Sequence, residues 1–184
     1  MRAARALLLA AALTACGGSA SPSCPADLAP SATPNARADP DLAATIPDEV
    51  AGEPLNMATF CVTELDGLGG IQTSPEMLEA LGVRLEDVTV AAMSPQIGTP
   101  GGLVSVGAYR YAGADEDTLR DAFVRLFEQA ATEAGIDVDI EEASIGGKEV
   151  HRAAGAVYYA ADDTLYTVES GNQDKVEEVL AALP

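Results

Sequence analysis

The sequence has no tryptophan and a single histidine, His151, and aromatic residues make up only 4% of it. Without tryptophan, a stacking surface for sugars or other flat ligands is disfavoured. A lone histidine acts as a general base only beside a nucleophile and an orienting acid, and no G-x-S-x-G nucleophile motif occurs. We therefore assign no catalytic residue and expect a non-enzymatic protein, with His151 on a partly exposed strand.

Positive charge is also scarce: 10 lysines and arginines stand against 29 aspartates and glutamates, which gives a formal net charge of −19. Such a surface repels nucleic acid phosphates and anionic lipid headgroups, so we expect no nucleic acid partner. Charges spread over solvated faces also keep a chain rich in alanine and glycine soluble.

Long apolar runs are missing. The segment Ala6–Leu13 is well short of the roughly 20 apolar residues that a membrane-spanning helix needs. It follows Arg2 and Arg5 and ends in small residues, the layout of a secretory signal peptide.

The end of this segment, Leu13-Thr14-Ala15-Cys16, has an aliphatic residue, two small residues and a cysteine. It resembles the lipobox of bacterial lipoproteins. The resemblance implies that the signal is removed before Cys16, whose sulfur carries diacylglycerol and whose amine is often acylated, for example with palmitate. Two or more acyl chains hold a protein stably on a bilayer, so we expect attachment to the cell membrane on its extracytoplasmic side. The alternative is an ordinary secretory signal in which Cys16 is incidental.

The chain has three cysteines, and lipidation of one leaves Cys24 and Cys61. Export to an oxidising compartment favours a disulfide between them, worth roughly 3–4 kcal/mol by chain-entropy estimates. Two free thiols are the alternative. Neither has a histidine or second cysteine at metal-ligand spacing, so no metal site is predicted.

Composition divides the chain into three parts. Residues 1–15 form the expected signal peptide, and residues 16–45 the lipidated cysteine with a flexible tether rich in proline, alanine and serine. Residues 46–184 form one domain, long enough for a single core.

Within this domain the patterns predict three helices. Ser74 and Pro75 begin the first, which Gly82 ends. Asp115, Glu116 and Asp117 lie at the positive end of the second, whose apolar stripe spans 119–130, and the third covers 173–183. Strands are predicted at 55–62, 88–93, 103–111, 136–141, 149–154, 156–160 and 164–169.

Hairpins that lead into helices, without long parallel crossovers, favour an α+β fold in which an antiparallel sheet has helices packed on one face. The order strand, strand, helix occurs in both halves and suggests an internal pseudo-repeat.

The remaining motifs have structural explanations. Gly146-Gly147-Lys148 lacks the spacing of a phosphate loop and is typical of a tight turn. The acidic groups 115–117, 137–141 and 162–163 lack the register of a calcium loop. The five tyrosines fall on predicted strands, which indicates sheet packing.

The leading functional hypothesis is a membrane-anchored cell-envelope lipoprotein that displays a small non-enzymatic binding domain and uses no cofactor. Its partner is an envelope protein or a small ligand that the sequence does not identify. Two alternatives stay open: a carrier of an apolar or lipid ligand in an internal cavity, and an envelope hydrolase that uses His151.

Overall fold

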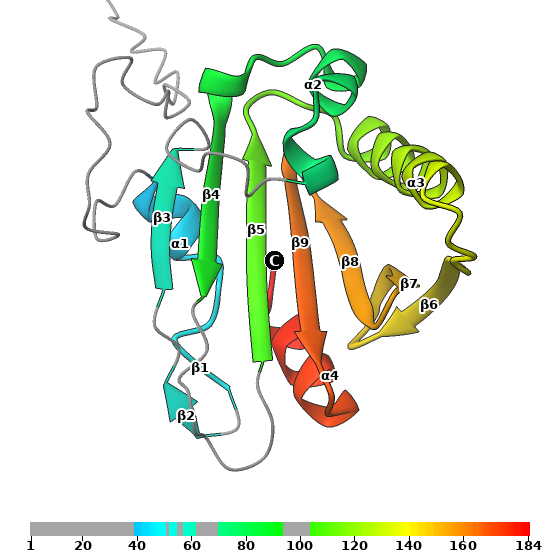
Figure 1. Ribbon diagram of the computed structural model, residues 1–184. Coiled ribbons are helices and arrows are strands. Elements are labelled where there is room, and N and C mark those ends of the chain that lie inside the picture. The colour runs from blue at the N-terminus through cyan, green and yellow to red at the C-terminus, as the bar shows by residue number, and fades with distance from the viewer. Residues whose placement is uncertain (1–38, 51, 55–56, 62–69, 94–103) are drawn as a thin grey trace, which may run out of the picture.

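A computed structural model describes residues 39–50, 52–54, 57–61, 70–93 and 104–184 (Figure 1). The helices are α1 (Pro40–Ala43), α2 (Pro75–Leu81), α3 (Glu116–Glu133) and α4 (Gln173–Ala182), with the 3₁₀ helices η2 (Gly70–Thr73) and η3 (Leu85–Asp87). The strands are β1 (Glu49–Val50), β2 (Glu53–Pro54), β3 (Met57–Cys61), β4 (Val88–Met93), β5 (Val104–Tyr111), β6 (Glu141–Ile145), β7 (Lys148–Ala153), β8 (Ala156–Ala161) and β9 (Thr164–Ser170).

Seven of the strands form one antiparallel sheet in the order β3-β4-β5-β9-β8-β7-β6, and β1 pairs with β2 apart from it. The central pair, β5 and β9, runs in register from Val104 opposite Ser170 to Arg110 opposite Thr164. The predicted α+β class, an antiparallel sheet with helices packed against it, is confirmed.

Alternation along the strands sends apolar side chains to both faces of this sheet. Val106 and Ala108 of β5 belong to the core beneath α1 and α4, whereas Tyr111 belongs to the core beneath α2 and α3. The helices are therefore divided between an α3 face and an α4 face, and they do not share one face as we expected. The reason is local: strands such as β9 present Leu165 to one side and Tyr166 to the other, so both sides need cover.

The suggested pseudo-repeat extends to the strands alone. β3-β4-β5 and β9-β8-β7 are arranged symmetrically about the central pair. A two-fold axis that passes through the sheet between β5 and β9 would place α3 and α4 on the same face. The two helices cover opposite faces, so they are not related by this symmetry.

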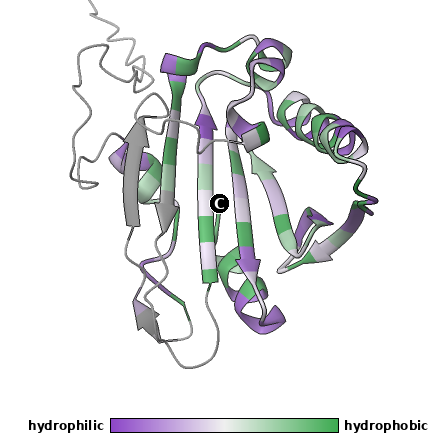
Figure 2. Ribbon diagram, viewed as in Figure 1, coloured by the Kyte–Doolittle hydropathy of each residue, from purple (hydrophilic) through white to green (hydrophobic). Residues whose placement is uncertain are grey.

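The helix boundaries follow the local chemistry that predicted them. Ser74 Oγ accepts a hydrogen bond from the Met77 amide at 3.2 Å, and Gly82 ends α2 with a φ of 66°. Asp115 caps α3 by accepting from the Thr118 amide at 3.0 Å. Figure 2 shows the hydrophobic and hydrophilic sides of α3 that result from its apolar stripe.

Two boundaries differ from expectation. The strand predicted at 136–141 begins only at Glu141. Ile136 is 59% exposed, whereas Val138 and Ile140 pack against the core on the α3 face without pairing with a described strand. The folded part includes residues from Asp39, where we expected a tether as far as Thr45. Leu42 of α1 is fully buried on the α4 face, so a segment of tether-like composition is part of the core.

Candidate functional site

The residues expected to carry the membrane attachment and the disulfide are Cys16, Cys24 and Cys61. Cys16 and Cys24 lie outside the described residues. Cys61 ends β3, but its side chain is not among those described, so the pairing of Cys24 with Cys61 stays a prediction.

His151 lies on β7 between two cross-strand neighbours, Glu142 of β6 and Tyr158 of β8. Its side chain is half-buried, and its Nδ1 atom is buried without a hydrogen-bond partner. An unpaired buried nitrogen raises the free energy of the folded state, because the nitrogen gives up its hydrogen bonds to water.

Glu142, Ser144 and His151 are the residue types of a hydrolytic triad, and register and alternation place all three on the α3 face. In such a triad, the Nδ1–H of histidine donates to a carboxylate that fixes the imidazole. Nδ1 of His151 has no such partner, so Glu142 does not orient it. The three residues are neighbours without the hydrogen bonds of a catalytic relay.

A groove of about 820 Å³ opens beside His151, between the first turns of α3 and the β6–β7 hairpin. We call it the α3–β7 groove. Its charged and polar lining includes Arg120 and Asp121 of α3, Glu142 and Ser144 of β6, and Glu149 and His151 of β7. This volume lies within the range of small-molecule and side-chain pockets.

The cations at the groove already have partners. Arg120 Nη2 lies 2.6 Å from Asp117 Oδ1, and its Nε lies 3.5 Å from Asp121 Oδ1. The hydrogen bond that Arg120 donates to Asp117 raises the pKa of Arg120. Lys148 Nζ donates to the Tyr159 hydroxyl at 3.4 Å and to the Pro184 carbonyl oxygen.

Two carboxylates at the groove stand without partners. Glu142 and Glu149 are exposed, and neither side-chain carboxylate has a hydrogen bond or ion pair with another described residue. Each faces an uncharged or half-buried cross-strand neighbour, Ser144 opposite Glu149 and His151 opposite Glu142. The groove therefore presents a net negative charge to an incoming group.

The other acidic clusters have structural roles. Asp115 caps α3, and the backbone hydrogen bond from Thr118 lowers the pKa of Asp115. Glu116 Oε2 accepts from the Asp162 amide at 3.0 Å, which ties α3 to the β8–β9 turn. Within the described ranges, no group of three or more His, Cys, Asp or Glu is arranged to hold a metal ion.

Gly146-Gly147-Lys148 forms the β6–β7 turn, as predicted, with φ values of 61° and 81° at the two glycines. A Cβ at Gly146 would come within 3.1 Å of the Ala181 amide nitrogen in α4. The turn is therefore docked against a helix, and a Cβ at Gly146 would require α4 to shift slightly as well as a strained left-handed backbone.

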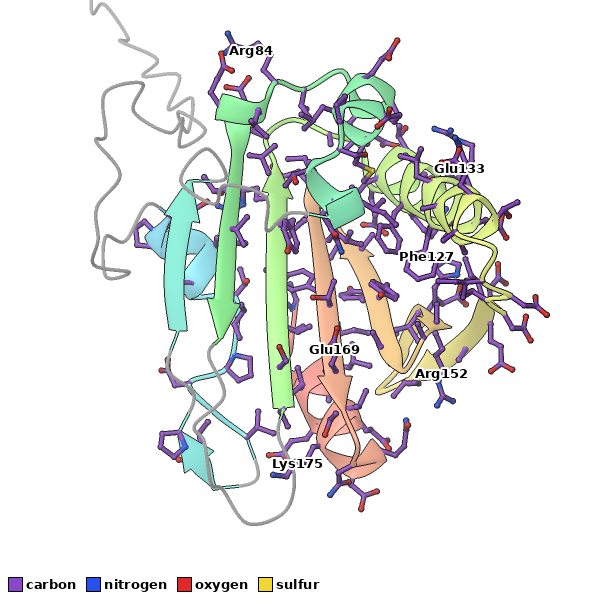
Figure 3. All side chains as sticks on the ribbon, viewed as in Figure 1. Arg84, Phe127, Glu133, Arg152, Glu169 and Lys175 are labelled. Atoms are coloured by element: carbon purple, nitrogen blue, oxygen red, sulfur yellow. The ribbon has the colours of Figure 1, made fainter. Side chains whose placement is uncertain are left out.

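The tyrosines pack within the sheet cores. Tyr158 on the α3 face contacts Phe123 and Phe127, with ring centroids 4.6 and 5.6 Å apart, and Figure 3 shows Phe127 on the side of α3 toward the sheet. Tyr111 is fully buried, and its hydroxyl donates to the Gln72 carbonyl at 2.8 Å. Burial raises the pKa of both Tyr111 and Tyr158.

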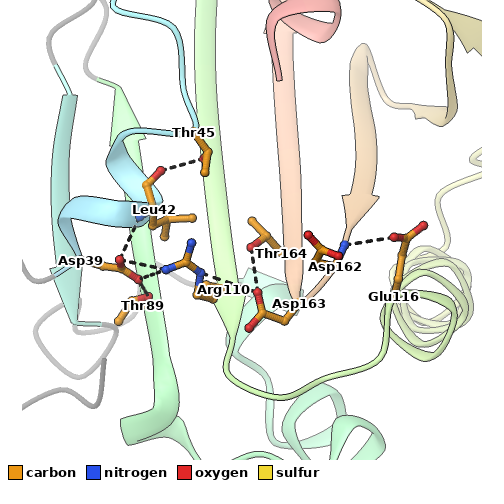
Figure 4. Close-up of polar contacts among 9 residues, drawn as sticks. All are labelled: Asp39, Leu42, Thr45, Thr89, Arg110, Glu116, Asp162, Asp163 and Thr164. Atoms are coloured by element: carbon orange, nitrogen blue, oxygen red, sulfur yellow. Dashed lines mark hydrogen bonds and ion pairs between the residues drawn. The ribbon is translucent and has the colours of Figure 1, made fainter. Parts of the chain in front are cut away.

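Sequence analysis missed a buried ion pair that joins α1 to the sheet (Figure 4). Asp39, fully buried, accepts from Arg110 Nη1 of β5 at 2.8 and 2.9 Å, from Thr89 Oγ1 at 2.7 Å and from the Leu42 amide at 2.9 Å. Arg110 Nε also lies 3.6 Å from Asp163 Oδ1. Asp39 followed by Pro40 is the pattern of a helix N-cap, and this pattern was the available signal.

In the part of the chain that is described, no helix has both the length and the apolar character to cross a bilayer. Compared with known proteins, the chain matches no family model, no curated protein and no solved structure.

Proposed function

We propose that the chain is a cell-envelope lipoprotein, held on the extracytoplasmic side of the cell membrane by lipid on Cys16, and that its single α+β domain is a non-enzymatic binding module. The observation that carries the proposal is the sequence Leu13-Thr14-Ala15-Cys16 after a short apolar run led by Arg2 and Arg5. Two or more acyl chains at one end of the protein would hold it stably on the bilayer.

The arrangement of the domain supports a display function. The folded part is entered at α1, which contacts β3 and β4 and packs on the α4 face (Figure 1). The α3–β7 groove lies at the other end of the sheet, on the α3 face. Four strand spacings, roughly 20 Å, separate β4 from β7. A groove so placed is turned away from the point where the tether joins.

The described side chains favour binding over the two alternatives. A carrier needs an enclosed apolar cavity between sheet and helix, whereas Leu119 of α3 and Val179 and Leu180 of α4 are fully buried within packed clusters. A hydrolase needs an oriented His151, whose Nδ1 lacks a partner.

The membrane attachment is tested by detergent phase partition of the full chain produced in a bacterial host. We expect wild type to enter the detergent phase and the Cys16→Ser variant to stay in the aqueous phase. Cys24→Ser is the matched control, since it removes a thiol outside the lipobox, and it should behave as wild type. Equal partition of the Cys16→Ser variant and wild type would contradict the proposal.

A further inference from the structure

β6 is the edge strand at one end of the seven-stranded sheet. Among the described residues it pairs only with β7, so its outer edge carries backbone amides and carbonyls without a strand partner. Such an edge is a template for an added strand. β6 is five residues long and exposed at Glu141, Glu142 and Ser144.

The α3–β7 groove adjoins this edge and selects the charge of an added strand. Glu142 of β6 and Glu149 of β7 both line it, and both lack a charged partner within the described ranges. Two cations, Arg120 and Lys148, also line the groove. Arg120 is neutralised on α3 by Asp117 and Asp121, and Lys148 donates to the Tyr159 hydroxyl and to Pro184. A second copy of this chain would bring further negative charge to the same place, because the net charge is −19.

We infer that the β6 edge and the α3–β7 groove together bind a basic, extended segment of a partner protein. The segment pairs its backbone with β6, and side chains at every second position reach the groove, where lysine or arginine meets Glu142 and Glu149. Strand addition supplies affinity through the main chain, and the carboxylates supply selectivity for positive charge. This inference rests on the proposed binding function and names the class of partner.

The test uses the full chain in detergent and a fluorescent peptide of alternating lysine and valine, followed by anisotropy. We expect binding that weakens about tenfold or more in the E142K/E149K variant, because two attractions become repulsions. The matched control is E79K/E128K, with the same net charge and both changes on exposed helix positions away from the groove. The control should remain within about twofold of wild type. Equal weakening in both variants, or in neither, overturns the inference.

Two further probes separate strand addition from attraction of any cation. A lysine-valine peptide methylated at alternate backbone nitrogens cannot pair with β6, so we expect its binding to be at least about tenfold weaker. Spermine, which has charge and no peptide backbone, should not displace the peptide at equal concentration. Full binding of the methylated peptide, or full displacement by spermine, contradicts an added strand.

The result is independent of the membrane attachment. Peptide binding should be the same for wild type and Cys16→Ser. A chain that binds peptide but shows no lipid on Cys16 would refute the proposed anchoring and leave this inference standing, and the reverse pattern would refute the inference alone.

Discussion

At β4 and β5 a fully buried carboxylate, Asp39, is paired with a largely buried guanidinium, Arg110, whereas at the β6–β7 end two carboxylates are exposed and have no partner among the described residues. The carboxylate of Asp39 is fully buried and accepts hydrogen bonds from Leu42, Thr89 and Arg110. The carboxylates of Glu142 and Glu149 accept no hydrogen bond from the described residues. The Asp39 carboxylate therefore helps to specify the fold, whereas the carboxylates of Glu142 and Glu149 are available to a partner.

The largest effect should come from breaking the buried pair. Arg110→Met removes the guanidinium that pairs with the buried Asp39, and we expect a loss of about 3–5 kcal/mol in the free energy of unfolding, measured by urea denaturation. Arg84→Met is the matched control. Its side chain is 70% exposed and its pairs with Glu86 and Asp87 lie at the surface, so the loss should be at most about 1 kcal/mol. Similar losses in both variants would erase the distinction between the two ends.

The next largest effect should come from a substitution that tests whether the β6–β7 hairpin is docked on α4 in spite of its exposed charge. Gly146→Ala combines a left-handed backbone with a close approach to Ala181 of α4, and we expect a loss of about 2–3 kcal/mol. Ala154, with a φ of 51°, occupies the corresponding place in the β7–β8 turn. Ala154→Gly should therefore change stability by no more than about 1 kcal/mol. A Gly146→Ala variant as stable as wild type would mean that the hairpin is not docked on α4.

A smaller effect on the free energy of unfolding is expected from the buried, neutral hydroxyl of Tyr111. Burial raises the pKa of Tyr111 in the folded state, so the folded protein holds this proton when the unfolded chain releases it. Its contribution is complete below about pH 10 and is lost as the pH rises further. Tyr111→Phe should reduce this alkaline slope and cost about 1 kcal/mol at neutral pH through the lost bond to Gln72. An unchanged slope of unfolding free energy against pH would contradict the burial of the hydroxyl.

The smallest effect is expected at the groove. Replacing Glu142 and Glu149 by glutamine removes exposed charge that touches no described partner, so the free energy of unfolding should change by less than about 0.5 kcal/mol. The same urea titration measures it. A loss of 2 kcal/mol or more, on the order of a core substitution, would show that these carboxylates belong to the fold.

Features set by residues close together in the chain could be predicted from the sequence, and features set by distant residues could not. Ser74, Pro75, Gly82 and Asp115 act through neighbours within a few residues, so the ends of α2 and α3 were predictable. The meeting of β5 and β9 at the centre of the sheet was not predictable, because this pairing spans about 60 residues and local periodicity does not encode it.

The candidate site was harder to predict than the fold. His151 was singled out because it is the sole histidine, but its neighbours Glu142 and Ser144 lie on β6, which the sequence placed several residues too early. Asp39 was lost because its partners, Thr89 and Arg110, come from strands far along the chain. Cross-strand register sets Glu142 opposite His151 and Thr89 opposite Arg110, and a one-residue slip would have changed these neighbours.

The central claim is that a lipid on one cysteine holds this acidic domain at the membrane. Mass spectrometry of the intact protein from the envelope fraction tests it most directly. The account predicts a chain that begins at Cys16 and is heavier than its sequence by a diacylglyceryl group, with or without an acyl group on the amine. A chain that retains an unmodified Cys16, or that begins at another residue, would contradict it.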